Sequence, residues 1–267
     1  GCQRPGTHAR HRVRQAWGRR HDGAVERDHG AHEAPLDGQR AGQVPRGPRQ
    51  VQRINLPKAM SSLLKIYEDK PDDKAVREVV ECLNRGGVIV CPTDTVYSFA
   101  CLLGNSKGFD RIARLKGLKP EKAHFSLLCS DLSDLSTYTQ HLSNTTFKTM
   151  KRVLPGPYTF VLPASNQVPK LYKSSKKTIG IRVPDHSVAL AILKALGKPL
   201  VVSSVHDDDD VLEYTTNPEL IDERWGHAVD MTVDGGIGHL HASTVVDCTG
   251  DEPEVVREGL GDVDALG

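Results

Sequence analysis

The stretch GVIVCPTDTVYSFAC at residues 87–101 decides the fold of this chain. The run GVIVC is apolar after its glycine, which is typical of a strand buried on both faces. Pro92 ends that strand, because proline has no N–H to donate to a sheet ladder. The PTDT segment at 92–95 is a turn made of two hydroxyls and one carboxylate, and residues 97–103 resume as a strand. The sequence therefore predicts two buried strands joined by a polar turn.

Outward from this stretch, helical and strand patterns alternate. Residues 73–84 place Val76, Val79 and Leu83 at helical spacing, and Gly86 stops that helix. Further strands are predicted at 63–67, 125–129, 158–162, 178–183, 200–205, 229–233, 243–248 and 253–257, and further helices at 106–116, 132–138, 145–153, 186–196 and 217–225. The interleaving predicts an α/β fold with a twisted mixed sheet, flanking helices, hairpin-like strands at both ends and one core of roughly 200 residues.

The 267 residues carry a net charge of only +1, but the charge is divided unevenly. Residues 1–59 hold 12 basic and 5 acidic residues, a net of +7, whereas residues 60–267 have a net of −6. The first fifty residues include few large apolar side chains, so we expect 1–59 to be a disordered basic extension. Met60 is then the expected natural start. A basic arm that binds nucleic acid is the alternative.

Composition and motifs exclude several classes of protein. No apolar stretch approaches the about 20 residues of a membrane-spanning helix. The six cysteines have no CxxC spacing, which favours buried free thiols in a reducing compartment and no metal site. The glycine-rich nucleotide motifs, the GxSxG elbow and HExxH are all missing from the sequence.

Polar side chains gather where the predicted strands end, which is where ligands collect in open α/β sheets. They are Thr93, Asp94, Thr95 and Tyr97 after the first long strand; Lys116, Lys119 and Lys122 after a helix; Thr178 and Arg182 on a strand; and Ser203, Ser204 and His206 at another strand end.

Each group also has a plainer interpretation. The PTDT turn can be local capping, and the three lysines can be a solvated face. Arg182 sits on an apolar strand, so its charge needs either a salt bridge or a ligand. His206 precedes four aspartates at 207–210, which can be a solvated loop, a helix cap or ligands of Mg²⁺.

Taken in order, a set of segments resembles the YrdC/YciO family over about residues 63–260, and it is closer to the YciO-like branch. They are GGVIVCPTDTVYSFAC, RIARLKG, HFSLLCSDLSDLSTY, LPGPYTFVLPAS, KKTIGIRVPDH, PLVVSSVH and ASTVVDCTGDEPEVVREG. The resemblance implies a YrdC-like domain at 60–267 with a concave basic face. It also implies a threonylcarbamoyl-AMP synthase-type reaction: ATP, L-threonine and bicarbonate give threonylcarbamoyl-AMP and pyrophosphate, for modification of tRNA. Mg²⁺ would arrive with ATP, and no tightly bound cofactor is expected.

The same resemblance implies a role for particular residues. It gives catalytic roles to Lys116, Thr95 and Tyr97; nucleotide contacts to Lys116, Ser126, Arg182, Ser243 and Arg257; and threonine contacts to Thr95, Tyr97, Ser204 and His206. Lysine and arginine offset phosphate charge, and hydroxyls orient an amino acid. The reaction needs no protein nucleophile, so positioning and charge stabilisation carry the catalysis.

Two positions depart from the family pattern. Its Lys-x-Arg motif reads Lys116-Gly117-Leu118 here, and its Ser-x-Asn motif reads Ser204-Val205-His206. Both changes affect contacts to ATP and threonine, so the resemblance leaves it open whether the chain is an enzyme.

The alternative function is a module that binds tRNA or double-stranded RNA without efficient synthesis. It rests on basic residues in the middle of an otherwise acidic domain. They are Lys107, Arg111, Arg114, Lys116, Lys119, Lys122, Lys148, Lys151, Arg152, Lys173, Lys176 and Lys177. On either hypothesis we expect a cytoplasmic protein with no membrane partner and no obligate protein partner.

Overall fold

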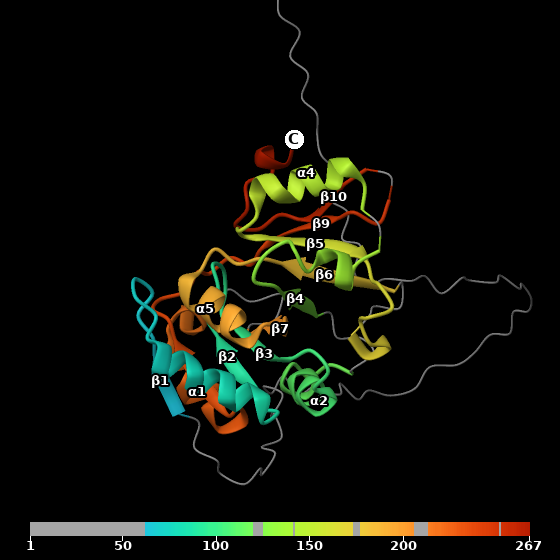
Figure 1. The fold of residues 1–267 in the computed structure, drawn as a ribbon. Helices are drawn as coiled ribbons and strands as arrows, with labels where there is room; N and C mark the ends of the chain where they lie inside the picture. The colour runs from blue at the N-terminus through green and yellow to red at the C-terminus, as the bar shows by residue number, and fades with distance from the viewer. Residues whose placement is uncertain (1–61, 120–124, 141, 173–176, 206–212, 251) are drawn as a thin grey trace, which may run out of the picture.

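The structure is a computed structural model that describes residues 62–119, 125–140, 142–172, 177–205, 213–250 and 252–267. The predicted extension at 1–59 lies outside the described residues. Within these ranges, ten strands form one twisted sheet in the order β1-β8-β2-β3-β7-β4-β6-β5-β9-β10 (Figure 1). The strands are β1 (Ser62–Lys65), β2 (Ile89–Cys91), β3 (Ser98–Leu102), β4 (Ser126–Leu128), β5 (Tyr158–Pro163), β6 (Thr178–Arg182), β7 (Leu200–Ser204), β8 (Met231–Asp234), β9 (Thr244–Asp247) and β10 (Glu254–Arg257).

The sheet is mixed, as predicted. β1, β8 and β2 run parallel, whereas β2, β3, β7 and β4 alternate in direction. β4 and β6 are parallel, and so are β5 and β9. The hairpin expected near the C-terminus is confirmed as β9–β10. The expectation of a hairpin at the other end is wrong for β1, because β8 lies between β1 and β2 and pairs with both.

Helices flank both faces of the sheet. They are α1 (Asp73–Asn84), α2 (Ser106–Leu115), α3 (Leu135–Tyr138), α4 (Asn144–Val153), α5 (Ser187–Leu196) and α6 (Pro218–Trp225). The predicted helix at 73–84 is confirmed, and the Asp72 carboxylate caps it by accepting from the N–H groups of Lys74 and Ala75. Within the described ranges, no helix is long and apolar enough to cross a membrane.

The helix predicted over 132–138 is shorter in the structure, where α3 begins only at Leu135. The Asp131 carboxylate accepts hydrogen bonds from the N–H and the hydroxyl of Ser133. An aspartate that bonds to the chain two residues onward offers the backbone a turn in place of a helix. The turn at 131–133 therefore delays the start of α3.

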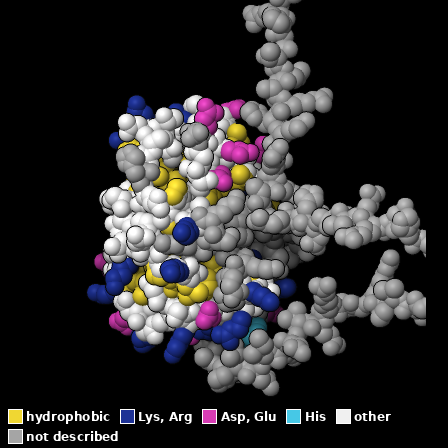
Figure 2. All heavy atoms as spheres, turned by 90° about the vertical axis from the view of Figure 1, so that its right-hand side faces the viewer, with side chains coloured by type: hydrophobic (Ala, Val, Ile, Leu, Met, Phe, Trp, Pro, Cys, Tyr) yellow, Lys and Arg dark blue, Asp and Glu magenta, His cyan; other side chains and the backbone are white. Residues whose placement is uncertain are grey.

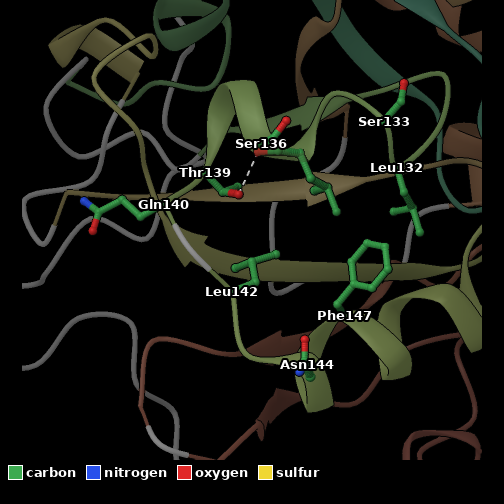
Figure 3. A pocket seen from close by; sticks show the side chains of 9 residues that line it. Leu132, Ser133, Ser136, Thr139, Gln140, Leu142, Asn144 and Phe147 are labelled. Atoms are coloured by element: carbon green, nitrogen blue, oxygen red, sulfur yellow. Dashed lines mark hydrogen bonds between the residues drawn. The ribbon is translucent and has the colours of Figure 1, made fainter.

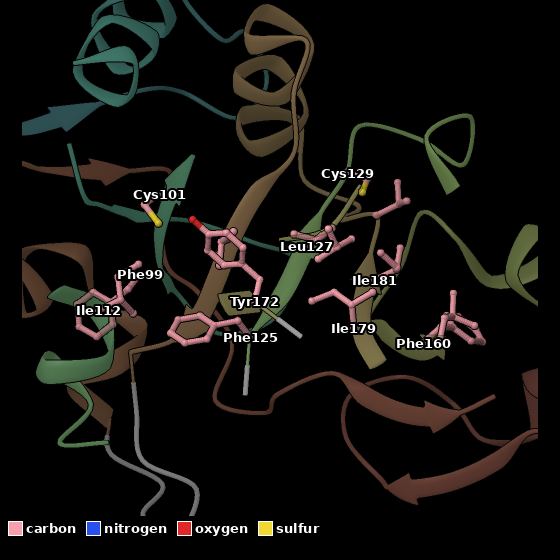
Figure 4. Close-up of a cluster of buried hydrophobic side chains, with 14 of the residues drawn as sticks. Phe99, Cys101, Ile112, Phe125, Leu127, Cys129, Phe160, Tyr172, Ile179 and Ile181 are labelled. Atoms are coloured by element: carbon pink, nitrogen blue, oxygen red, sulfur yellow. The ribbon is translucent and has the colours of Figure 1, made fainter. Parts of the chain in front are cut away.

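Two clusters of buried apolar side chains occupy the two faces. One packs α2 and α4 against strand residues that include Phe99 and Leu127 (Figure 4). The other packs α1 and α5 against strand residues that include Ala100 and Leu128. Successive residues of a strand point to opposite faces, which is why each of these neighbouring pairs is divided between the clusters.

The face that α1 and α5 cover becomes polar in the half of the sheet beyond β4. Ile179 and Ile181 of β6 belong to the cluster of α2 and α4, so the residues between and beyond them point the other way. The same alternation applies in β4, β5 and β9, and a register shift between Val255 and Arg257 of β10 places Arg257 opposite Val245, on the same side. We call this half the polar face, and its side chains are Ser126, Thr159, Thr178, Arg182, Ser243 and Arg257.

Candidate functional site

The loop at 92–97 joins β2 to β3 and has its own internal hydrogen bonds. The Thr93 hydroxyl donates to the Val96 carbonyl at 2.8 Å and accepts from the Thr95 N–H at 3.2 Å. The plainer interpretation of the turn as local capping is therefore correct for Thr93. The Thr95 side chain, by contrast, reaches a distant strand.

Arg182 of β6 holds this loop against the polar face. Its Nη2 atom lies 2.8 Å from Oδ1 of Asp94 and donates to the Thr95 hydroxyl at 2.9 Å. The side chains of Arg182 and Asp94 are each only 7% exposed. The salt bridge that the sequence left as one of two interpretations of Arg182 is thus present.

This pair still has unused hydrogen-bonding capacity. Among the described residues, Nε of Arg182 and Oδ2 of Asp94 are buried without a hydrogen-bond partner. Burial lowers the pKa of the Arg182 guanidinium, the Asp94 carboxylate opposes that shift, and the positive charge of Arg257 adds to it. Arginine nevertheless stays charged in proteins. A buried donor and a buried acceptor side by side suit a ligand that is itself both anionic and cationic.

The rest of the polar face supplies hydroxyls and a second cation. The hydroxyls of Thr159 and Ser243 are 2.7 Å apart, and Nη2 of Arg257 donates to the Ser243 carbonyl at 3.0 Å. Ser126 faces Gly180 across the β4–β6 ladder. A Cβ atom on Gly180 would lie 2.5 Å from the Ser126 hydroxyl, so only glycine leaves this hydroxyl its place.

Lys116 and Ser204 are in contact at the end of β7, an inner strand of the sheet. Lys116 directly follows α2, and its Nζ donates to the Ser204 carbonyl at 3.1 Å. Ser204 pairs with Ser98 of β3, and the next residue, Val205, donates its N–H to the Tyr97 carbonyl at 3.0 Å. The hydrogen bond between Val205 and Tyr97 thus connects Lys116 and Ser204 to the loop at 92–97.

Tyr97 is the last residue of this loop, and its side chain lies in the apolar cluster of α2 and α4, on the face opposite the polar face. Its side chain is buried, and its hydroxyl donates to the Gly236 carbonyl at 2.6 Å and accepts from the Gly235 N–H at 3.1 Å. Burial raises the pKa of the Tyr97 phenol. The hydroxyl thus bonds to two backbone groups, and a contact between Tyr97 and a substrate stays a prediction.

The structure therefore joins the predicted residues in three groups: Thr95 with Arg182, Ser243 with Arg257, and Lys116 with Ser204. His206 lies outside the described residues. The sequence placed Asp94 among the polar residues at strand ends but gave neither Asp94 nor Thr159 a role in the site. The signal for Asp94 was present, since a charge on the apolar strand of Arg182 needs a counter-ion and PTDT places a carboxylate after another buried strand.

His186, at the start of α5, is a further buried polar group that the sequence reasoning did not select. Its side chain is 8% exposed, and its Nδ1 has no hydrogen-bond partner within the described part of the chain. Burial lowers the pKa of the His186 imidazole, while the carboxylates of Glu68 and Asp94 raise it. His186 thus belongs to the electrostatic surroundings of Asp94.

The predicted basic cluster is divided between two helices. Arg111 and Arg114 lie on α2, whereas Lys148 and Lys151 lie on α4 near the opposite end of the sheet (Figure 1). Arg111 is also engaged internally, with Nη1 2.6 Å from Oδ2 of Asp230. Figure 2 shows blue Lys and Arg side chains at separate places on one face, with acidic groups among them. Lys122, Lys173 and Lys176 lie outside the described residues.

A hollow of about 420 Å³ lies away from the predicted residues, between the α3 region and α4 (Figure 3). It is lined by Leu132, Ser133, Leu135, Ser136, Thr139, Gln140, Leu142, Asn144 and Phe147. Its lining is uncharged, so it does not suit a nucleotide phosphate. In the described ranges, no group of three His, Cys, Asp or Glu side chains is placed to hold a metal ion.

Comparison with known proteins identifies a family for the chain. The profile of the Sua5/YciO/YrdC family, which is described as Telomere recombination, matches residues 81–259. The Escherichia coli K12 protein YciO, described as uncharacterized, is 41% identical over 206 residues, which are 76% of this chain and 98% of that protein. A threonylcarbamoyl-AMP synthase of Halorhodospira halophila is 30% identical over 171 residues, 64% of this chain and 88% of that protein.

The fold is similar as well. The crystal structure of E. coli YciO superposes with a TM-score of 0.72 at 39% sequence identity, covering 78% of this chain and all of that chain. The profile match spans more than half of the sequence and includes every described residue of the polar face and of the loop at 92–97. The chain therefore belongs to the Sua5/YciO/YrdC family.

Proposed function

We propose that this chain binds ATP and L-threonine at the polar face and forms threonylcarbamoyl-AMP with release of pyrophosphate. The observation that carries the proposal is the buried pair Arg182–Asp94, which keeps one donor and one acceptor unused within the described structure. L-threonine and ATP together bring the complementary groups, namely an ammonium and negatively charged oxygens. The relative from H. halophila, named as such a synthase, supports this choice of reaction.

Each side chain then has a definite task. Nε of Arg182 donates to a nucleotide phosphate oxygen, and Oδ2 of Asp94 accepts from the threonine ammonium. Arg257 and Lys116 add positive charge around the phosphates, with Mg²⁺ arriving on ATP. The hydroxyls of Thr95 and Ser204 orient threonine. Ser126 and Ser243 line the nucleotide side of the same surface.

The reaction needs the protein to position the reactants and does not need a nucleophile from the protein. The threonine ammonium first gives a proton to water, and the free amine then attacks bicarbonate; loss of water leaves an N-carboxylate. One oxygen of that carboxylate attacks the α-phosphorus of ATP, the bond to the β-phosphate oxygen breaks, and pyrophosphate leaves. The negative charge that develops at the α-phosphate is what Arg182, Arg257 and Lys116 would stabilise.

We expect slow synthesis, because one cation of the family pattern is replaced by Leu118. The Leu118 side chain is 40% exposed and brings no charge. Lys116 donates to the Ser204 carbonyl, which fixes its ammonium near the loop at 92–97. A single lysine neutralises less phosphate charge than a lysine and an arginine together.

The test is pyrophosphate release by the purified chain with MgATP. Release should require both threonine and bicarbonate, and Lys116→Ala should lower it about tenfold or more through loss of a charge-assisted contact. Lys151→Ala removes a lysine from α4, far from the polar face, and serves as the matched control. Release that continues without threonine, or that Lys116→Ala leaves unchanged, would contradict the proposal.

The same preparation tests the RNA-binding alternative. If the chain binds tRNA or duplex RNA at low salt and releases no pyrophosphate, that alternative replaces synthesis. Because Lys148 and Lys151 lie on α4, Lys148→Glu with Lys151→Glu would then weaken RNA binding without touching the polar face.

A further inference from the structure

The loop that follows β8, residues 235–239, is bonded to the back of the loop at 92–97. The Tyr97 hydroxyl donates to the Gly236 carbonyl at 2.6 Å and accepts from the Gly235 N–H at 3.1 Å. The His239 N–H donates to the Thr95 carbonyl at 3.0 Å. Three hydrogen bonds thus hold Thr95 and Tyr97 to the loop at 235–239.

The loop at 235–239 is itself fixed at both ends. Oδ1 of Asp234, the last residue of β8, accepts from the Gly236 N–H at 2.9 Å. The Gly238 N–H donates to the Thr216 carbonyl at 2.8 Å. A segment held at its start and near its end can act as a rigid support, although Ile237 between these points is 74% exposed.

The approach of the two loops leaves no room for larger residues at two glycines. A Cβ atom on Gly235 would lie 2.7 Å from the Pro92 ring. A Cβ atom on Gly238 would lie 3.0 Å from the Tyr97 ring. Close packing and the hydrogen bonds of the Tyr97 hydroxyl therefore both hold the loop at 235–239 against the loop at 92–97.

We propose that Tyr97 and the loop at 235–239 are positioning elements for threonine, a role that rests on the proposed function. Tyr97 touches no substrate. It fixes the backbone of 95–97, so that the Thr95 hydroxyl stays beside Arg182 and the Asp94 carboxylate stays directed at the ammonium. Arg182 and Arg257 stand on β6 and β10, whose backbones the sheet anchors, so the nucleotide contacts depend less on this support, even though Arg182 also bonds to Asp94 and Thr95.

The experiment uses the full chain with two variants and two matched controls. Tyr97→Phe removes the hydroxyl and leaves the Gly235 N–H and Gly236 carbonyl unpaired, while Gly238→Ala presses on the Tyr97 ring. Tyr172→Phe is the control for the first, because its hydroxyl also accepts from a backbone N–H, that of Gly104, at 3.1 Å. Gly250→Ala is the control for the second, because its Cβ would have ordinary room.

Two measurements separate structure from function. Amide hydrogen exchange at Gly235 should be about tenfold faster or more in Tyr97→Phe, because its N–H loses the Tyr97 hydroxyl as acceptor, and exchange at His239 should also be faster, because the loop is held less firmly. Threonine affinity by calorimetry should fall about tenfold in Tyr97→Phe and Gly238→Ala, while ATP affinity without threonine stays within about twofold. Both controls should keep wild-type threonine affinity, and thermal melting confirms that each protein is folded.

The outcomes distinguish this inference from the function beneath it. If the wild-type chain binds threonine and Tyr97→Phe binds it as well as Tyr172→Phe does, the positioning role is overturned and the proposed function stands. If threonine and ATP affinities fall together, Tyr97 supports the whole site and the selective role is overturned. If the wild-type chain binds no threonine, the proposed function fails first and this role with it.

Discussion

Arg182 and Asp94 lie 88 residues apart in the sequence, yet their Nη2 and Oδ1 atoms are 2.8 Å apart in a buried salt bridge. The contact joins the end of β6 to the loop between β2 and β3, although β7 and β4 lie between β3 and β6 in the sheet. Because both side chains are almost fully buried, each depends on the other for compensation of its charge.

The first prediction concerns this dependence. Asp94→Asn should lower the free energy of unfolding by about 3 kcal/mol, because it leaves the Arg182 charge buried without its counter-ion. Urea denaturation measures the loss. Asp131→Asn alters an exposed carboxylate bonded only within its own turn, and should cost less than about 1 kcal/mol. Equal losses in the two variants would mean that the buried pair is not special.

A second prediction restores a missing charge. Leu118→Arg should raise threonine-dependent pyrophosphate release about tenfold, because it returns a second phosphate-binding cation to the stretch after α2. The exposed leucine can be replaced without opening the core. Leu118→Ala is the control, and an equal rise in that variant would show that removal of leucine, rather than addition of charge, is responsible.

The third prediction follows from the buried thiols. Burial raises the pKa of Cys101 from 9.0 to about 12, and those of Cys91, Cys129 and Cys248 shift in the same direction for the same reason. The unfolded chain therefore ionises these thiols at lower pH than the folded chain does. Their contribution to stability is complete below pH 9 and is lost progressively as the pH rises toward 12.

This loss can be measured by urea unfolding at a series of pH values, with Cys101→Ala reducing the slope above pH 9. The folded protein at pH 8 should also resist thiol reagents at the described cysteines, all of which are buried. Rapid labelling of Cys101 in the folded state would contradict the prediction.

A fourth prediction addresses the connection between α2 and β8. Arg111 donates from Nε to the Ala228 carbonyl and pairs through Nη1 with Asp230, whose carboxylate also accepts from the Val88 N–H. Arg111→Ala should cost about 1–2 kcal/mol of stability, measured by denaturation, because it removes the contacts to Ala228 and Asp230 and leaves the half-buried Asp230 carboxylate without its counter-ion. Arg114→Ala on the same helix should cost clearly less; a reversed order would contradict this account.

The elements of the fold could be read from the sequence because their patterns are local. Alternation and helical spacing placed almost every strand and helix, and the apolar run before Pro92 located the central strand. The partner of β1 could not be found this way, because pairing with β8 depends on residues far along the chain. The start of α3 was displaced by a side-chain bond at Asp131, which periodicity does not register.

The candidate site was predicted in its parts but not in its connections. The sequence showed that Arg182 needed a partner, and it placed Asp94 in a polar turn, but only the twist of the sheet brings them together. Tyr97 received its predicted role from the resemblance of the segment at 87–101 to the YrdC/YciO family. Its hydroxyl bonds to Gly235 and Gly236, which lie 138 and 139 residues further along the chain, so a local motif did not reveal the contact.

The edge pairing of β1 with β8 has a consequence for synthesis of the protein on the ribosome. Ser62 lies beside Met231, so the first described strand must wait for nearly the whole domain to emerge before its partner exists. Until then the emerging polypeptide exposes an unpaired strand, a state that invites chaperones or aggregation. The sheet of this protein is therefore completed late in translation.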